Sequence, residues 1–543
     1  MDQAINIDIG TSGIRAQLLN LMESSVLRTA ILSRNPLPGA NVVDHMDFAI
    51  SYGQETTHEI LVSAVNSLIN NLKPRNFKRI SVCGNPIQLS LFEGIEVRDL
   101  AFAGKNALEK INLKPPKRDG HIVSGNEIGL YEDVDVIIPP SVSHEIGADA
   151  LAMMIKTGFL DTSETCMVTD YGTNAEMALK VDDKIYTGSA AAGPAIEGQQ
   201  ISKGMLATPG AIADFRLSGG WQELVLDEKL RMVEGPKINL RNGTFKNTRC
   251  PVKGITGTGV IALMYAGLVT GVIKPPHIEG GNIRLGKGIT FTEKDVIEAG
   301  KAFGALRAGH LTLMHEAGVA YENLETMYMC GASGTYVDPL KARFTGIVPA
   351  TAKTIIQCGN TSLELAKDLA FDPDYLSYLN EMKKSLLANH IMFASSPTFA
   401  DIYIQEIALW NEGMPLEKYN ANLERSGIQP IPQKLQEIVI EKKYERDIHE
   451  LGKCLEILES KLDFIANIQC SGCDVCVKEC QEEALSRENE SFRINTARCL
   501  GTACRRCEEI CPEKKFSISN FRLDLSGSVR MGKQSDNNNL AQP

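Results

Sequence analysis

Two dense runs of cysteine near the C-terminal end constrain this chain more than any other feature of its sequence. They contain eight of its fourteen cysteines, in the spacings C-x2-C-x2-C-x3-C and C-x4-C-x2-C-x3-C-P. Where such runs bind two cubic clusters, the first three cysteines of each run hold one cluster and the fourth crosses to the other. The spacing therefore predicts two [4Fe-4S] clusters. The predicted ligands are Cys470, Cys473, Cys476 and Cys511 for one, and Cys480, Cys499, Cys504 and Cys507 for the other.

Three other interpretations of the cysteines fit less well. Structural zinc prefers separated cysteine pairs or cysteine–histidine pairs, and no histidine lies between Cys470 and Cys511. A disulfide framework is typical of small secreted proteins, whereas this chain has 543 residues and no recognisable secretion signal. The opening of the second run is also that of plant-type [2Fe-2S] sites, but there the fourth ligand is remote. The runs depart from the usual pattern in the longer first gap of the second run and in Gln481, which replaces a proline.

The composition indicates a soluble globular protein of several domains. The chain has 543 residues, of which 43% are hydrophobic and 23% are charged, as in ordinary soluble proteins. Its net charge of -11 argues against a nucleic-acid partner, because binding phosphates requires clustered Lys and Arg. No apolar run approaches membrane-spanning length, and the N-terminal residues lack the pattern of a secretion signal. We therefore expect a cytoplasmic protein that binds neither nucleic acid nor membrane.

The other cysteines and the histidines show no further metal-binding pattern. The nine histidines include no pair at a spacing that would place two ligands on one helix face, so we expect no mononuclear metal site. The scattered cysteines are expected to be buried thiols; they are Cys83, Cys166, Cys250, Cys330, Cys358 and Cys454.

A short motif near the N-terminus indicates contact with phosphate. Residues 4–9 and 14–20 read as strands, and the turn between them carries Asp8, Gly10, Thr11 and Ser12. Glycine lets the backbone approach a phosphate, and the hydroxyl groups and backbone amides can bond its oxygens. Asp8 would face the metal ion that bridges the phosphates. Taken alone, such a motif is more commonly an ordinary hairpin turn.

The motif recurs in the middle of the chain, together with the elements around it. Asp170, Gly172, Thr173 and Asn174 lie between two further strands and match the first copy almost position for position. After each copy come a third strand, a helix and another strand. These are residues 26–33, 54–72 and 79–83 in the first half, and residues 184–189, 293–316 and 326–330 in the second. We therefore predict two lobes with facing phosphate loops, which hold a nucleotide between them.

These repeated features resemble the actin-like ATPase superfamily, which includes actin, sugar kinases and heat-shock chaperones. The resemblance implies a duplicated two-lobed α/β fold, of the ribonuclease H-like kind, with ATP and Mg²⁺ in the cleft and Asp8 and Asp170 as catalytic residues. Gly331, Ala332, Ser333 and Gly334 resemble the adenosine-binding turn of that superfamily. The small residues 147–148 and 359–366 resemble its connections between the lobes.

Three segments narrow the resemblance: residues 189–198, residues 254–259 and residues 291–334. Together they are similar to the ATP-dependent reductive activators of corrinoid proteins. The similarity is greatest to those with a C-terminal two-cluster domain like a bacterial ferredoxin, which serve the methylamine methyltransferase corrinoid proteins of methanogens. It covers residues 5 to about 516. This chain has Ala332 and Ser333 where many relatives have a Gly-Phe pair.

The resemblance implies an oxidoreductase that returns inactive Co(II) corrinoid to Co(I) in methylamine-dependent methanogenesis, one electron at a time. Its partners would be the corrinoid proteins of methylamine methyltransferase systems and a low-potential electron donor. Two other functions stay open. One is an ATP-gated iron–sulfur redox sensor or scaffold. The other is an activator of a dehydratase-type radical enzyme, although such proteins usually share one cluster between two subunits.

The domain organisation follows from these motifs. We expect a first lobe at residues 1–163, a second lobe at 164–412 with an insertion at 193–290, and the ferredoxin-like domain at 467–520. Residues 413–466 between them are predicted to be a hinge followed by an amphipathic helix, because apolar residues repeat from Ile448 to Ile465 at helical spacing. The polar tail at residues 521–543 is expected to be disordered.

Overall fold

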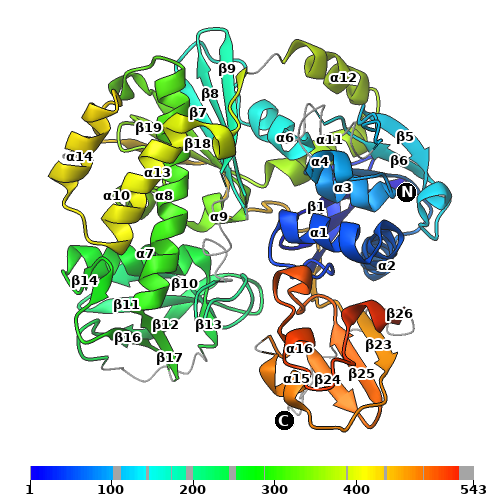
Figure 1. The fold of residues 1–543 in the computed structure, drawn as a ribbon. Coiled ribbons are helices and arrows are strands. Elements are labelled where there is room, and N and C mark those ends of the chain that lie inside the picture. The colour runs from blue at the N-terminus through cyan, green and yellow to red at the C-terminus, as the bar shows by residue number, and fades with distance from the viewer. Residues whose placement is uncertain are drawn as a thin grey trace, which may run out of the picture.

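The computed structural model describes residues 2–101, 112–141, 146–172, 174–190, 200–243, 252–286, 288–386, 389–432, 437–480 and 482–524. Thr173, Cys250, Gln481 and most of the predicted disordered tail therefore lie outside the described residues. The chain forms two large lobes side by side, with a small C-terminal domain against the first lobe (Figure 1). In the part of the chain that is described, no helix combines the length and the apolar character needed to cross a membrane.

The first lobe is built on a seven-stranded sheet in the order β22-β3-β2-β1-β4-β6-β5. Its strands are β1 (Gln3–Ile9), β2 (Ile14–Asn20), β3 (Ser25–Leu32), β4 (Phe77–Gly84), β5 (His121–Ser124), β6 (Asp135–Ile138) and β22 (Leu455–Leu458). All seven residues of β1 are buried, because elements pack on both faces of this central strand. Ile5, Ile7 and Ile9 lie in the apolar core, whereas Asn6 points to the opposite face and donates a hydrogen bond to the Leu363 carbonyl at 3.0 Å.

The second lobe repeats this sheet. Its order is β20-β9-β8-β7-β18-β19-β21, and β9-β8-β7-β18-β19 match β3-β2-β1-β4-β6 both in order and in strand direction. The strands are β7 (Cys166–Tyr171), β8 (Ala175–Val181), β9 (Lys184–Ala190), β18 (Thr326–Cys330), β19 (Thr354–Gly359), β20 (Asn389–His390) and β21 (Val439–Lys442). The predicted duplicated α/β fold is confirmed.

Helices surround both sheets. Those that pack in the first lobe are α1 (Val42–Tyr52), α2 (Gln54–Leu72), α3 (Pro86–Glu93), α4 (Arg98–Ala101), α6 (Ala148–Lys156), α11 (Thr361–Phe371) and α12 (Tyr375–Ser385). Those of the second lobe are α7 (Gly257–Val269), α8 (Glu293–Glu316), α9 (Gly331–Tyr336), α10 (Pro339–Thr345), α13 (Pro397–Asn411) and α14 (Leu416–Arg425). A capping box, in which Thr292 and Asp295 bond each other's backbone N–H groups, fixes the start of α8.

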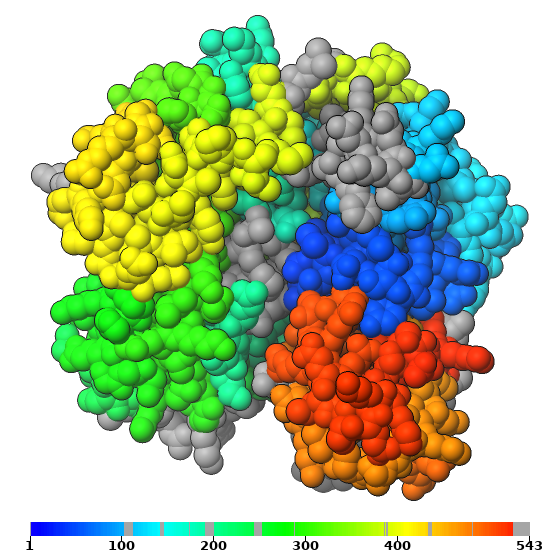
Figure 2. All heavy atoms as spheres, in the orientation of Figure 1, coloured from blue at the N-terminus to red at the C-terminus, as the bar shows by residue number. Residues whose placement is uncertain are grey.

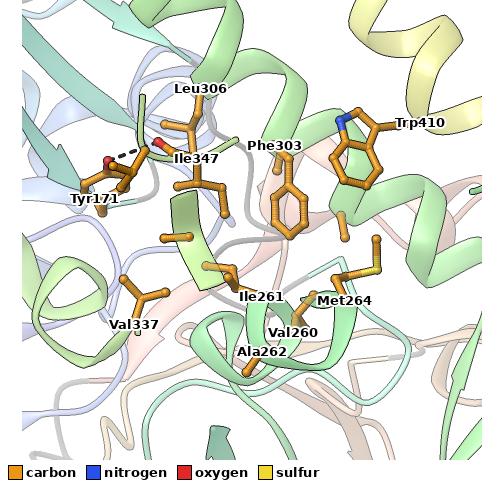
Figure 3. Packing of buried hydrophobic residues seen from close by; sticks show 14 of the residues in the cluster. Tyr171, Val260, Ile261, Ala262, Met264, Phe303, Leu306, Val337, Ile347 and Trp410 are labelled. Carbon is orange, nitrogen blue, oxygen red and sulfur yellow. Dashed lines mark hydrogen bonds between the residues drawn. The ribbon is translucent and has the colours of Figure 1, made fainter. Parts of the chain in front are cut away.

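Between β9 and α8 the second lobe carries additional small sheets. They comprise β10 (Ala211–Leu217), β11 (Trp221–Leu226), β12 (Met232–Ile238), β13 (Gly254–Ile255), β14 (Ile273–Lys274), β15 (His277–Ile278), β16 (Asn282–Leu285) and β17 (Ile289–Thr292). Figure 3 shows Val260, Ile261 and Met264 of α7 near Phe303 and Trp410, and the apolar cluster that they form also includes Phe215 of β10 and Leu285 of β16. The added sheets therefore share the core of the second lobe.

The chain returns to the first lobe after β19. Helix α11 packs on β1 and β4, and α12 continues on the same side, where Asn380 exchanges two hydrogen bonds of 2.8 Å with the backbone of Gly120. Both helices fall inside the range predicted for the second lobe. Sequence order therefore does not separate the lobes, because the chain crosses between them more than once.

The C-terminal domain is a four-stranded antiparallel sheet in the order β24-β25-β23-β26 with two short helices. Its elements are β23 (Asp463–Asn467), α15 (Val475–Glu479), β24 (Leu485–Glu488), β25 (Ser491–Asn495), α16 (Arg506–Glu509) and β26 (Arg522–Asp524). Phe464 packs against Phe48 of α1, with ring centroids 5.9 Å apart, and both belong to one apolar cluster. The orange and red surface of this domain accordingly lies directly on the blue surface of the first lobe (Figure 2).

The predicted amphipathic helix before this domain is wrong. Residues 455–458 form β22, which pairs with β3 in parallel, and residues 463–467 form β23. Gly452 interrupts any helix there, because its φ is +68° and a Cβ would lie 2.4 Å from the Leu27 carbonyl carbon. An edge strand also satisfies the backbone groups of β3, which a helix cannot do. The predicted hinge contains helix α14.

A buried ion pair in the second lobe gives a test of this packing. Glu406 is fully buried and bonds Arg307 at 2.6 and 2.5 Å, and the Tyr419 hydroxyl donates to the same carboxylate. Glu406→Gln leaves the guanidinium buried without its counter-charge, so we expect a loss of about 3–5 kcal/mol in the free energy of unfolding. Tyr419→Phe removes one hydrogen bond and should cost about 1–2 kcal/mol. Denaturant unfolding measures both, and equal losses would contradict the prediction.

Candidate functional site

A cleft of about 210 Å³ lies between the two lobes. Of the predicted nucleotide-site residues, it is lined by Asp8, Gly10, Thr11, Ser12, Asp170, Gly172, Asn174, Gly331, Ala332 and Ser333. Gly334 lies behind the cleft wall, where a Cβ would be 3.2 Å from the Tyr171 ring. Thr173 lies outside the described residues. The structure thus brings the two predicted phosphate loops and the predicted adenosine turn together around one space.

The first loop is a tight turn at the end of β1. Gly10 N–H donates to the Gly13 carbonyl at 3.1 Å, which closes the turn between β1 and β2. A Cβ on Gly10 would lie 2.9 Å from that carbonyl oxygen, so glycine is needed for this approach. Asn85, at the end of β4, donates a hydrogen bond of 3.0 Å to the Thr11 hydroxyl. The loop is therefore held by its neighbours before any ligand binds.

Asp8 lies at the base of the first loop and is only 6% exposed. Asn360 donates a hydrogen bond to its carboxylate at 2.7 Å, and Arg15 Nη1 lies 3.7 Å from the same oxygen. Burial raises the pKa of Asp8, while Arg15 and Asn360 partly oppose that shift. A nearby cation, such as the predicted metal ion, would stabilise the ionised form of this buried carboxylate.

The second loop has the same construction at the end of β7. Gly172 N–H donates to the Asn174 carbonyl at 3.2 Å. Gly331 has a φ of +79°, and a Cβ on it would lie 2.3 Å from Asp170 Oδ1. Glycine at this position thus allows the start of α9 to touch the carboxylate of the second loop.

Three residues that the sequence interpretation did not identify also line the cleft. Asp149, in the first turn of α6, has a pKa raised to about 6 by burial, with a smaller contribution from the charge of Asp8. Asp447 accepts a hydrogen bond of 2.8 Å from Tyr336 of the second lobe and lies 3.4 Å from Arg15 Nε of the first. Asn360 links Asp447 to the first loop, because its backbone N–H donates to the Asp447 carbonyl at 2.9 Å and its side chain donates to Asp8.

The eight cysteines of the C-terminal domain form two groups in space. Cys470, Cys473, Cys476 and Cys511 line one small cavity, whose apolar walls include Ile468, Phe492 and Phe516. Each group combines three cysteines of one run with the fourth cysteine of the other. In the second group, burial raises the pKa of Cys507 to about 12, and the charges of Cys499, Cys504 and Cys480 contribute to the same shift.

Four thiols around one apolar cavity are a ligand set of the kind that holds an iron–sulfur cluster. Among the described residues, no three side chains of His, Cys, Asp or Glu converge closely enough to hold one metal ion. In the second group, Gly501 N–H donates to Cys499 Sγ at 3.3 Å, a hydrogen bond of the kind that tunes cluster sulfurs. The second group faces the first lobe, because Gly39 N–H donates to the Cys499 carbonyl at 2.9 Å. Cys473, in the first group, is exposed to solvent.

Comparisons with known proteins agree with this arrangement. A family model described as the C-terminal domain of RACo, the ASKHA domain, matches residues 164–420, and one described as the RACo middle region matches residues 3–162. A solved structure of a "reductive activator for corrinoid, iron-sulfur protein" superposes with a TM-score of 0.60 at 22% identity, over 75% of this chain and 66% of that one. The fold and cleft thus define an ATPase of the actin-like class.

Two curated proteins are similar in sequence. The "[Co(II) methylated amine-specific corrinoid protein] reductase" of Methanosarcina barkeri is 45% identical over 92% of this chain and 95% of that protein. The "corrinoid activation enzyme RamQ" of Eubacterium limosum is 23% identical over 74% of this chain and 69% of that protein. The chain belongs to the family of reductive activators of corrinoid proteins.

The crossing of the fourth cysteines can be tested by additivity. If Cys511 and Cys473 serve the same cluster, Cys511→Ser and the double variant with Cys473→Ser should both lose one cluster, about four of the eight irons. Cys511→Ser combined with Cys504→Ser should lose both clusters. Iron and sulfide analysis after anaerobic reconstitution measures this. The pairing is contradicted if the Cys511–Cys504 double variant still retains four irons.

Asp149 predicts a pH dependence of nucleotide binding. Its pKa is raised to about 6, and a bound Mg²⁺ favours the ionised carboxylate, so the proton must leave when the metal–nucleotide complex binds. Binding should therefore weaken about tenfold between pH 7 and pH 5 beyond the loss caused by protonation of the nucleotide itself. Asp149→Asn should lose this tenfold component and keep only the losses caused by protonation of the nucleotide and of Asp8. Calorimetric titration of both proteins across this range measures the difference, and identical pH profiles would exclude the role.

Proposed function

We propose that this protein uses ATP–Mg²⁺ to drive the one-electron reduction of Co(II) to Co(I) in the corrinoid proteins of methylamine methyltransferase systems. The observation that carries the proposal is the coexistence, in one chain, of a two-loop cleft and two groups of four cysteines. The name of the Methanosarcina relative supports the substrate. A low-potential electron donor must supply the electrons, and the cytoplasm is the expected location.

The residues of the cleft have distinct roles in this proposal. Asp8 and Asp170 would hold Mg²⁺, while Thr11, Ser12 and Asn174 would bond the phosphate oxygens. Gly331, Ala332 and Ser333 receive the adenosine, and Gly334 packs behind them. Because the two phosphate loops come from different lobes, a bound nucleotide favours the closed arrangement by contacting both.

The two groups of cysteines would hold two [4Fe-4S] clusters, which supply single electrons at low potential. For a one-electron step, every 59 mV by which the potential of the Co(II)/Co(I) couple lies below that of the donor reduces the equilibrium constant tenfold. Nucleotide can offset this only if its states bind the partner differently. The segment that carries Asp447 supports such coupling, since it touches both lobes at the cleft and then leads through β22 into the cysteine domain.

The alternatives are less well supported. A sensor with a degenerate nucleotide site does not require both carboxylates and both glycine turns at one cleft, as found here. An activator of dehydratase-type enzymes would not require eight cysteines in one chain.

The proposal predicts a separation of functions. Asp8→Ala and Asp170→Ala should reduce ATP-dependent formation of Co(I) by about 10³-fold or more, the scale for removing a group that organises phosphoryl transfer. Both variants should keep the cluster absorbance, because the two carboxylates line the cleft between the lobes and the cysteines lie in the C-terminal domain. The test mixes reduced protein with a Co(II) corrinoid subunit, with and without ATP–Mg²⁺, and follows the visible spectrum of Co(I).

The exposed Asp183, in the turn between β8 and β9, provides a matched control, and Asp183→Ala should behave like the wild type. Activation that persists in both cleft variants would refute the assignment of the cleft. Absence of Co(I) despite bound nucleotide and intact clusters would favour the sensor.

A further inference from the structure

A continuous series of contacts joins the first phosphate loop to the loop that carries Cys499. It begins at Asn35, which follows β3 and is 3% exposed. The Asn35 backbone N–H donates to the Ser12 carbonyl at 2.7 Å, and its side-chain Nδ2 donates to the Gly10 carbonyl at 2.9 Å. Both acceptors belong to the backbone of the phosphate loop, so Asn35 must respond to any displacement of that backbone.

Asn35 also fixes the turn that follows it. Leu37 N–H donates to Asn35 Oδ1 at 3.0 Å, which makes an Asx turn. Gly39 N–H then donates to the Cys499 carbonyl at 2.9 Å. Pro38 lies so close to Gly501 that a Cβ on Gly501 would be 3.2 Å from Pro38 Cβ. The turn therefore ends directly on the backbone of the cysteine loop.

Buried side chains brace this connection from the side. Asn35 Nδ2 also donates to Gln88 Oε1 at 3.2 Å, and Gln88 Nε2 lies 2.7 Å from His45 Nδ1. Burial lowers the pKa of His45 to about 3, so the ring is neutral and can accept this hydrogen bond. Phe48, on the same helix as His45, also packs near Gly501. A buried polar network of this kind holds its members in one arrangement.

The contacts end on a group that influences electron affinity. Gly501 N–H donates to Cys499 Sγ at 3.3 Å. Hydrogen bonds to cysteine sulfurs and the surrounding protein shell set the reduction potential of a cluster. A shift of Pro38 against Gly501 would lengthen or shorten this bond, and the potential would change with it.

The two groups of cysteines differ in whether their loop contacts the segment that leads to the phosphate loop. Gly472 and Gly501 each follow the first cysteine of their run by two positions, and their φ values are +73° and +56°. The site of a Cβ on Gly472 is 2.9 Å from the Arg487 guanidinium, within the same domain. Gly501 instead faces Pro38 of the first lobe. Of these two equivalent glycines, Gly501 is thus the one in contact with the segment that leads to the phosphate loop.

We propose that Asn35 is a positioning residue that couples nucleotide binding at the first phosphate loop to the reduction potential of the cluster held by Cys480, Cys499, Cys504 and Cys507. This inference rests on the proposed function, since it requires both nucleotide and clusters. The coupling joins two binding equilibria and is reciprocal, so reduction of that cluster changes nucleotide affinity by the same factor.

The test is a redox titration of the reconstituted protein, with and without a saturating non-hydrolysable ATP analogue and Mg²⁺, followed by electron paramagnetic resonance. In the wild type, the analogue should change the reduced-to-oxidised ratio of one cluster by about threefold at a fixed potential. This corresponds to a midpoint shift of about half of the 59 mV that a tenfold change represents. Asn35→Ala should nearly abolish this change while the analogue stays bound. Asn35→Ser, whose hydroxyl can still accept from Leu37 N–H but cannot span the distance to Gly10, serves if the alanine variant does not fold.

Two controls make the result specific. Asn66 of α2 is also a buried asparagine of the first lobe, but its side chain bonds the Gly129 carbonyl and the Tyr131 N–H instead of the phosphate loop, so Asn66→Ala should keep the nucleotide effect. Gly501→Ala and Gly472→Ala each disturb one cysteine loop and shift one baseline potential. They therefore assign the two titrations to the two groups of cysteines.

Each outcome decides the question. An unchanged potential in the wild type with bound analogue, a shift confined to the cluster of Cys470, or an undiminished shift in the folded Asn35 variants would overturn the inference. None of these would affect the proposed function if ATP still drove Co(I) formation. Failure of the wild type to bind nucleotide would instead refute the proposed function itself.

Discussion

The hydrogen bond from Asn360 to Asp8 joins the parts of this molecule that must act together. Asn360 lies where the chain leaves β19 for the first lobe, and its side-chain oxygen caps α11 by accepting from Leu363 N–H. Its amide group reaches the carboxylate at the end of β1, and its backbone N–H contacts the segment of Asp447. The crossing between the lobes, the first phosphate loop and the path to the cysteine domain therefore meet at a single residue.

Local patterns in the sequence predict the parts of the structure that are made by neighbouring residues. Each phosphate loop joins two consecutive strands, Gln3–Ile9 to Ile14–Asn20 and Cys166–Tyr171 to Ala175–Val181, and the cysteines are grouped in two short runs. Helix α8 has the predicted range, residues 293–316, and its start is fixed locally by the capping box of Thr292 and Asp295. The grouping of the cysteines in space also follows the predicted crossing of the fourth ligand.

The rest depends on contacts between distant parts of the chain. Apolar residues from Ile448 to Ile465 have helical spacing, yet the free edge of β3 and the left-handed Gly452 impose strands there. Asp447 belongs to a polar segment without a motif, and it acquires a role only where Arg15 and Tyr336 meet it. Asp149 follows two small residues in the predicted lobe connection. That signal could have identified it, because a carboxylate at such a crossing faces the cleft.

Strand β22 has a mechanical consequence for the molecule. Because it completes the sheet of the first lobe shortly before the cysteine domain, it tethers that domain to the sheet edge, and the domain can swing away only by separating Phe464 from Phe48 and breaking the hydrogen bond between Gly39 and Cys499. The cysteine domain therefore stays attached to the first lobe, and small shifts such as that of Pro38 against Gly501 can pass between them. The second lobe contributes no strand to that sheet, so closure of the cleft would move it relative to the cysteine domain. If a protein docked beside the cysteines, ATP binding would move the second lobe toward it or away from it. The distance from its own cofactor to the cysteine domain would change little.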